Sequence, residues 1–188
     1  MNKLERVVYD LVKRNTKAKN FLRDSYQSVL SIIPQKTIDS KYEIIEREGY
    51  FYGFHDKNPW SFNNKMLLAH KFNIEDRIPK EEGQIEIGYF HGANFSEFKS
   101  LGKTMSWNWQ QGAMLQWLNG KNEIIYNDWD GERNIAKIID IEGNLIMSLE
   151  KPIGAIDSKG EIATSYSFER LNIGMKGYGY AKENDLYK

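Results

Sequence analysis

Residues 114–126 read Met114-Leu115-Gln116-Trp117-Leu118-Asn119-Gly120-Lys121-Asn122-Glu123-Ile124-Ile125-Tyr126. A largely apolar stretch is followed by a polar, glycine-containing one and then by a second apolar stretch. An Asn-Gly pair between two apolar segments favours the tight turn of a β-hairpin, because both residues tolerate a positive φ. The stretch therefore predicts two short antiparallel strands joined by a turn.

Two other stretches, residues 58–69 and 152–164, follow the same plan of strand, polar turn and aliphatic strand. Aligning Trp60, Trp117 and Ile156 gives intervals of 57 and 39 residues. The second interval is close to the roughly 40 to 50 residues of a propeller blade, and the first leaves room for an insertion. The pattern predicts a series of sheet repeats of the β-propeller type.

Short apolar segments separated by Asn, Asp, Gly and Ser continue on both sides of these hairpins, which is typical of an antiparallel, mainly β protein. The segments predicted as strands are 42–46, 49–54, 65–72, 84–90, 97–101, 113–118, 123–126, 134–140, 145–149, 153–156 and 161–167. We expect a mainly β fold, a partial β-propeller of about three blades of antiparallel sheet.

The first 34 residues differ from the rest. Apolar residues recur at three- and four-residue spacing from Leu4 to Ile33, which predicts an amphipathic α-helical segment that ends at Pro34. We therefore divide the chain into a helical segment, residues 1–34, and propeller-type repeats, residues 35–188, which we expect to be incomplete.

The composition excludes several classes of protein. The 26 basic and 26 acidic residues cancel, so the chain lacks the net positive charge that attracts nucleic acid. It contains no cysteine, which fits a reducing compartment, and charges near the N-terminus interrupt any secretory signal. No apolar run is long enough to predict a transmembrane segment. We expect a cytoplasmic protein that does not bind nucleic acid.

The hairpins resemble the Trp-Ser-Pro-Asp-Gly repeats of TolB-like and WD40-like propellers. Across nearly the whole chain, the sequence also resembles a bacterial family with such repeats, often associated with surface-polysaccharide loci. A more distant similarity is to oligogalacturonate-lyase-type propellers, whose metal-binding histidines have no match here. The segments that carry the resemblance are residues 107–118, 124–128, 167–171 and 177–181.

The resemblance implies a carbohydrate- or glycoconjugate-binding protein of bacterial surface-polysaccharide metabolism. About three blades are fewer than the four that a closed propeller needs. We therefore expect another copy of the chain, or a separately encoded C-terminal half, to complete the propeller. A glycan or another small molecule is the expected ligand.

The densest group of chemically distinctive residues is Trp107-Asn108-Trp109-Gln110-Gln111. Indole rings stack on the C–H faces of sugars while neighbouring amides bond the hydroxyl groups, so this segment is a candidate glycan site. In a strand, Trp107, Trp109 and Gln111 would share one face. The alternative is that the tryptophans pack between blades and the amides satisfy buried backbone groups.

Three residues are candidates for acid–base catalysis. His55 and His70 flank the first hairpin, and Asp128 follows a strand at the end where propellers carry ligands. Two histidines with an aspartate could also hold a divalent metal, but no tight metal-binding motif is present. We predict no cofactor.

Further polar residues are candidates for ligand binding, and Arg170 among them could pair with a carboxylate or phosphate on a sugar. These candidates are Asp76, Arg77, Asn127 and Arg170. The sequence leaves open whether the protein is an enzyme. A polysaccharide lyase or glycoside hydrolase with residues at the blade ends, and a protein-interaction scaffold, are the two alternatives to a glycan-binding protein.

Overall fold

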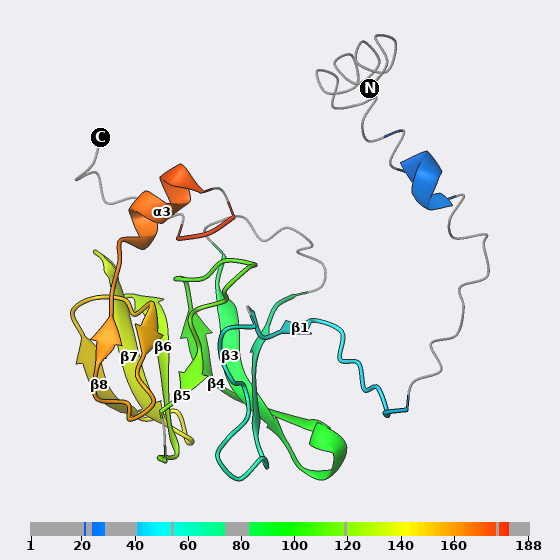
Figure 1. The fold of residues 1–188 in the computed structure, drawn as a ribbon, viewed down its shortest axis with the longest axis horizontal. Helices are drawn as coiled ribbons and strands as arrows, with labels where there is room; N and C mark the ends of the chain where they lie inside the picture. Colours follow the sequence, from blue (N-terminus) through cyan, green and yellow to red (C-terminus); the bar gives the residue numbers. More distant parts are fainter. Residues whose placement is uncertain are drawn as a thin grey trace. The chain divides into compact units, whose positions relative to one another are not determined.

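The structure is a computed structural model that describes residues 21, 24–28, 41–53, 55–73, 83–118, 120–175 and 177–180. The chain divides into two units, Met1–Ile45 and Glu46–Lys188. In the first unit, Phe21 and residues 24–28 are helical, in agreement with the predicted helical segment (Figure 1). The other residues of that segment, 1–20, 22–23 and 29–34, lie outside the described part of the chain.

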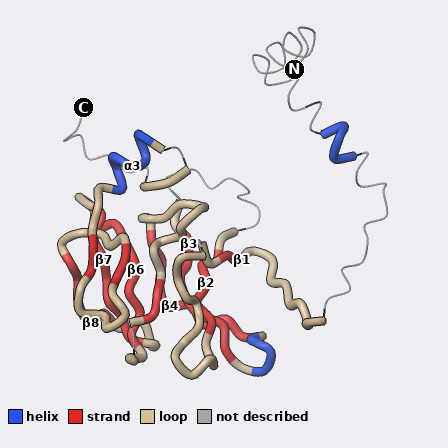
Figure 2. Tube along the Cα trace, viewed as in Figure 1, coloured by secondary structure: helices blue, strands red, loops and turns tan. Residues whose placement is uncertain are grey.

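The second unit is mainly β, as predicted, and its described strands form three antiparallel sheets (Figure 2). Within each sheet the strands follow one another in chain order. The first sheet contains β1 (Tyr50–Phe51), β2 (Leu67–Lys71), β3 (Ile85–His91) and β4 (Glu97–Thr104), and the second contains β5 (Gln116–Trp117), β6 (Glu123–Trp129), β7 (Asn134–Asp140) and β8 (Leu145–Leu149). The third sheet contains β9 (Ala155–Ile156) and β10 (Ala163–Thr164).

The three predicted hairpins share one register, which confirms their alignment. Three equivalent Cα pairs join their two arms: Trp60 with Leu67, Trp117 with Ile124, and Ile156 with Ala163. The backbone bonds repeat as well, since the N–H groups of Ser61, Leu118 and Asp157 donate to the carbonyls of Met66, Glu123 and Ile162, each at 2.9 Å. The hairpins are therefore structural repeats.

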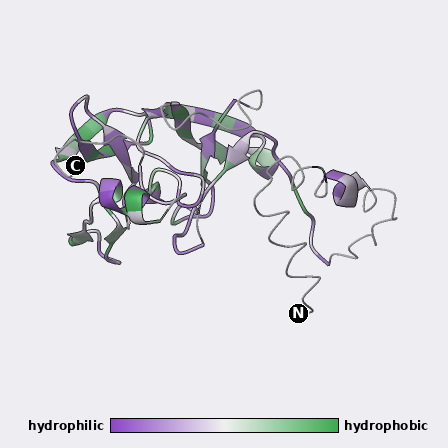
Figure 3. Ribbon diagram, turned by 90° about the horizontal axis from the view of Figure 1, so that it is seen from above, coloured by the Kyte–Doolittle hydropathy of each residue, from purple (hydrophilic) through white to green (hydrophobic). Residues whose placement is uncertain are grey.

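The second sheet contributes to a hydrophobic core on each of its faces, through β6 above all. Side chains alternate between the two faces of a strand, and in β6 Ile124 and Tyr126 belong to a core shared with Leu68 and Ile87 of the first sheet. Ile125, from the other face of β6, belongs to a second core, with Ile153 before β9 and with Phe168 and Tyr180 beyond β10. Figure 3 shows the resulting mixture of apolar and hydrophilic positions along the strands. The three sheets therefore pack side by side, as consecutive layers.

The structure corrects two details of the predicted elements. Residues 42–46, predicted as a strand, are irregular and exposed. After the third sheet the chain forms a short helix, α3 (Phe168–Gly174), which we did not predict. The Ser167 hydroxyl caps α3 by accepting the Arg170 N–H at 3.2 Å, a preferred N-cap arrangement. None of the described helices is long and apolar enough to cross a membrane.

Candidate functional site

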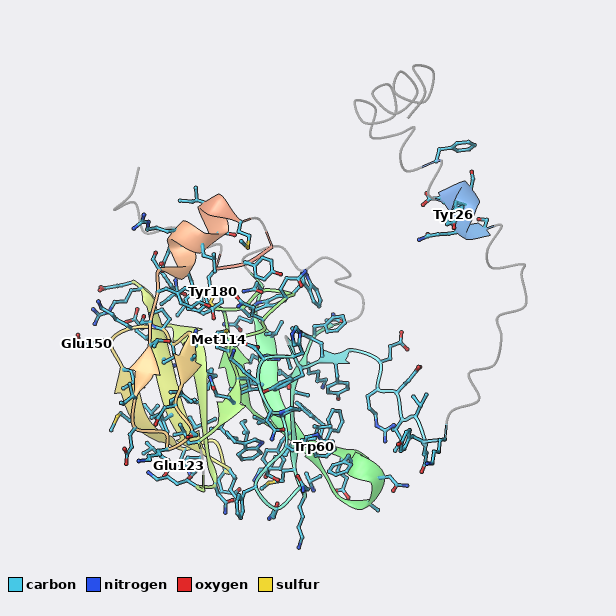
Figure 4. The ribbon with its side chains drawn as sticks, in the orientation of Figure 1. Tyr26, Trp60, Met114, Glu123, Glu150 and Tyr180 are labelled. Atoms are coloured by element: carbon cyan, nitrogen blue, oxygen red, sulfur yellow. The ribbon has the colours of Figure 1, made fainter. Side chains whose placement is uncertain are left out.

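A groove of about 440 Å³ lies where the turns of the three hairpins converge. Its lining side chains come from positions between 56 and 64 in the first hairpin, between 116 and 121 in the second, and between 156 and 158 in the third. Trp60 and Glu123, from the first two hairpins, lie at one end of the sheets, and Tyr180 lies near the other (Figure 4). The groove therefore forms because the shared register brings the equivalent turns of the three hairpins together.

Trp117 ties the first two hairpins together beside the groove. Its indole Nε1–H donates to the Pro59 carbonyl at 2.8 Å, and the same carbonyl accepts the Leu68 N–H at 2.9 Å. A buried indole N–H needs such an acceptor. This bond fixes the half-buried Trp117 ring as part of the groove wall.

Two further aromatic rings line the groove and are open to solvent. Phe62 is 89% exposed and Trp60 is 38% exposed. The Trp60 ring meets Phe95 edge to face, with 5.1 Å between the centroids, which leaves its orientation defined although it is partly exposed. Exposed aromatic rings in a groove are a common feature of ligand sites.

Polar side chains line the groove between these rings. Asn58, Asn64 and Gln116 contribute amides, and the charged residues come as opposite signs. Lys57 Nζ pairs with Asp56 Oδ2 at 2.7 Å, and Lys121 Nζ lies 3.6 Å from Glu123 Oε2. The groove therefore combines aromatic faces with hydrogen-bonding groups and carries little net charge.

Asp157 has a structural role at the edge of the groove. Its carboxylate accepts the backbone N–H groups of Glu161 at 2.8 Å and of Ile162 at 2.9 Å. These bonds, the one from Ile162 above all, lower the pKa of Asp157, because they stabilise the charged form. Asp157 thus closes the turn of the third hairpin as an anion.

The predicted glycan segment, residues 107–111, forms a tight turn and not a strand. Asn108 and Gly112 pair across it, and the Asn108 side chain accepts the N–H groups of Gln110 at 3.0 Å and Gln111 at 2.8 Å. Trp107 is buried, and its indole donates to the Gly83 carbonyl at 2.8 Å. The Asn108 amide therefore satisfies backbone groups and the Trp107 indole packs inside the protein, as the packing alternative predicts.

Trp109 is the residue of this segment that still offers an aromatic surface. It is 41% exposed, and its ring packs against Phe51, Phe72 and Trp107 with centroid distances of 5.0 to 5.2 Å. Gln110 is exposed and Gln111 is half-buried. Glycan binding at this segment stays a prediction, with Trp109 as its remaining platform.

His70, a residue of β2 in the first sheet, is completely buried against residues 112–113. Its Nε2 accepts the Ala113 N–H at 3.0 Å, and its ring stacks on Phe51 with centroids 4.8 Å apart. Burial lowers the pKa of His70 to about 4, and the nearby carbonyls of Phe51 and Tyr52 raise it by a smaller amount. The Nδ1 atom makes no hydrogen bond of good geometry. His70 is thus a neutral packing residue without access to solvent.

The other two catalytic candidates lie in different surroundings. His55 is exposed in a turn. Asp128 is buried in β6, where its carboxylate accepts from Lys137 Nζ at 2.7 Å and from the Met105 N–H at 3.3 Å. The structure therefore does not bring His70 and Asp128 together as an accessible acid and base. Among the described residues, no group of three or more histidine or carboxylate side chains could hold a metal ion.

The remaining candidates are dispersed. Asn127 is fully buried, and its amide bonds both backbone groups of Ile153 as well as the Tyr180 hydroxyl, at 2.8 to 2.9 Å. Arg170 is exposed on α3. Asp76 and Arg77 lie outside the described residues. Asn127 thus holds the second and third sheets together, at a position closed to ligands.

Sequence reasoning missed the groove residues Trp60, Phe62, Trp117 and Lys121 as members of one site. The signal was present, because Trp60 and Trp117 occupy the same place in aligned hairpins, and equivalent places in stacked repeats face the same way.

Comparisons of the chain with protein-family models, curated proteins and solved structures return no match.

Proposed function

We propose that the protein binds a carbohydrate or glycoconjugate in the groove between the three hairpin turns. The observation that carries the proposal is that the exposed Trp60 and Phe62 rings and two amides of the first hairpin meet Gln116 and Trp117 of the second hairpin and polar residues of the third at one hollow. Its volume, about 440 Å³, falls within the range of ligand sites, about 300 to 1,000 Å³.

The chemistry of the lining suits a sugar. Phe62 and Trp60 present apolar faces on which the C–H groups of a sugar ring can stack, and Asn58, Asn64 and Gln116 can exchange hydrogen bonds with hydroxyl groups. The paired charges of Lys57 and Asp56 leave no strong field for a highly charged ligand. A neutral or weakly acidic glycan fits these features best.

The wider setting is part of the same proposal. The two four-stranded antiparallel sheets have the strand order of propeller blades, and we propose that they and the third hairpin form part of a β-propeller. The sequence resemblance to propeller-repeat proteins of surface-polysaccharide loci points to the same class of ligand. We further propose that the protein acts in the bacterial cytoplasm.

The lyase or hydrolase alternative requires an accessible acid or base. Of its three candidate residues, only His55 is exposed, since His70 and Asp128 are buried and engaged. The scaffold alternative would leave the exposed Phe62 and Trp60 rings to a protein partner. The amides around these rings favour a glycan as the ligand.

The test is a glycan array of neutral and acidic bacterial oligosaccharides, followed by titration of any ligand found. Phe62→Ala and Trp60→Ala should each weaken binding by about tenfold, equivalent to about 1.4 kcal/mol. Ile173→Ala is the matched control, because Ile173 is a 64% exposed apolar side chain on α3. Unchanged affinity in both groove variants would sink the proposal.

A further inference from the structure

The outer edge of β10 is unpaired among the described residues, whereas its counterparts in the other sheets are paired on both sides. β10 corresponds to β2 and β6, because Ala163 aligns with Leu67 and Ile124 in the shared register. β2 lies between β1 and β3, and β6 lies between β5 and β7. β10 pairs with β9 alone.

The register identifies the backbone groups that this edge offers. Asp157 donates its N–H to the Ile162 carbonyl, so residue 162 bonds inward to the first arm of its hairpin. Inward and outward bonding alternate along an antiparallel strand, so Ala163 and Ser165 direct their N–H and C=O groups outward. Ile124 and Tyr126 hold the corresponding positions in β6, where the outer neighbour is β7.

The second sheet carries an apolar surface on the face that packs toward the third sheet. Met147 pairs with Ile138, and Leu149 with Ala136, so all four share the face that packs toward the third sheet. Ile138 and Leu149 are only partly buried there, and Met147 is 52% exposed. The third sheet thus leaves the outer half of this face uncovered.

In the first sheet, the equivalent face is covered by the second sheet. Ile139 and Ile141 of the second sheet complete the core that the two sheets share, and the Ile141 carbonyl accepts a hydrogen bond from the Tyr89 hydroxyl at 3.3 Å. Lys99 of β4 pairs with Glu142 in the β7–β8 turn. The outer half of one sheet is therefore covered by the β7–β8 hairpin of the next, and the third sheet has no such hairpin among the described residues.

We propose that the β10 edge and the Met147 face together form a docking site for a two-stranded β-hairpin supplied by a separate polypeptide chain. The hairpin would pair with Ala163 and Ser165 and would place alternate aliphatic side chains on Met147. This proposal goes beyond glycan binding and does not depend on it.

The character of the edge supports this occupant. Residues 162–166 carry no charge and no proline. β4, which is also an outermost strand, carries Glu97, Lys99 and Lys103, and charges of this kind protect an edge from pairing. The residues that follow β10 turn away from it, because they form α3 and then return Tyr180 to Asn127. The described chain therefore leaves the edge open for another chain.

The experiment uses the full chain and a fluorescent synthetic peptide of residues 133–151, which is the β7–β8 hairpin of this protein. Fluorescence anisotropy should show saturable binding. Ala163→Pro removes an outward N–H, and proline is tolerated at such an edge position, so this variant should fold and bind about tenfold more weakly. Met147→Lys should weaken binding to a similar extent.

Ile173→Lys is the control for Met147→Lys, since it also places a lysine at an exposed apolar position, and it should bind the peptide normally. Absence of saturable binding, or equal binding by the wild type and Ala163→Pro, would overturn the proposal. So would strong hydrogen-exchange protection of the Ala163 and Ser165 amides in the monomeric chain alone, because the edge would then be paired within the chain. Rapid exchange that slows when the peptide is added would support it.

Discussion

His70 and Asn127 occupy the same position in successive repeats, three residues after Leu67 and Ile124, and both are fully buried. Each accepts a backbone N–H from the segment that leads into the following sheet, from Ala113 at 3.0 Å and from Ile153 at 2.8 Å. Two different side chains thus make the same link between neighbouring sheets. An unpaired buried N–H is costly, so these links help to fix how the sheets pack and where the hairpin turns meet.

The His70 link predicts a loss of stability in acid. The pKa of His70 is about 4 in the folded protein, lowered from 6.5 mainly by burial. Between these values the unfolded chain binds a proton that the folded chain does not, so stability is fully present above pH 6.5 and declines as the pH falls toward 4. The decline should reach about 3 kcal/mol, measured by urea unfolding at a series of pH values.

The matched variants for this prediction are His70→Gln and His55→Gln. His70→Gln should be less stable at neutral pH but should show a shallower decline in acid. His55→Gln changes an exposed residue and should keep the slope of the wild type. A slope that is unaltered in His70→Gln would show that other groups cause the pH dependence.

Replacing Asn127 by alanine should destabilise the protein strongly. The change removes the partner of both backbone groups of Ile153 and of the Tyr180 hydroxyl, all at buried positions. Stranded buried groups cost about 1 to 3 kcal/mol each, so the three groups together predict a loss of at least about 3 kcal/mol. Denaturant unfolding measures it, with the exposed Asn122→Ala as control; similar stability for the two variants would contradict the role given to Asn127.

Two glycines with similar backbone angles separate a steric effect from a conformational one. Gly112 has φ +61° and Gly120 has φ +70°. A Cβ at Gly112 would overlap the His70 imidazole, whereas one at Gly120 would meet no atom within 4 Å. Alanine at Gly120 should cost about 1 kcal/mol from the left-handed backbone alone.

Alanine at Gly112 should cost at least about 2 kcal/mol more, because overpacking adds to the backbone cost. The free energies of unfolding of the two alanine variants give the comparison. Equal losses would mean that His70 does not pack against Gly112 as described.

The Asp128–Lys137 pair predicts an asymmetry between two substitutions. Lys137→Met would leave the buried Asp128 carboxylate without its cation, whereas Asp128→Asn would leave a lysine that is 28% exposed and can reach water. Removing one partner of a buried pair is most harmful when the remaining charge is trapped. We expect Lys137→Met to lose about 2 kcal/mol more than Asp128→Asn in thermal or urea unfolding; the reverse order would contradict this account.

The sequence allowed the strands and the repeat to be predicted because both depend on local pattern. Polar turns and apolar alternation located the hairpins, and aligning Trp60, Trp117 and Ile156 identified their shared register. Helix α3 was missed because it has only 7 residues, about two turns. Its core contact, Phe168 stacked on Tyr180 with centroids 4.2 Å apart, joins a helix residue to one that lies beyond the end of the helix.

The candidate site was harder to predict, because burial decides which polar residues can meet a ligand. His70, Asn127 and Asp128 have the chemistry of site residues, yet tertiary packing uses all of them inside the protein. Trp60 and Phe62 were visible in the sequence, but only the convergence of three turns makes them neighbours of Lys121 and Ser158. The spacing of hairpins along the chain does not reveal how close their turns lie in space.

The most direct test of the proposed glycan site is nuclear magnetic resonance of the tryptophan indole N–H groups during titration with an oligosaccharide chosen from the array. The chain has five tryptophans, which lie in different surroundings. If the groove is the site, the Trp60 and Trp117 signals should shift and saturate while those of Trp107 and Trp109 remain unchanged. Saturable shifts at Trp109 with none at Trp60 or Trp117 would contradict the account and return the site to residues 107–111.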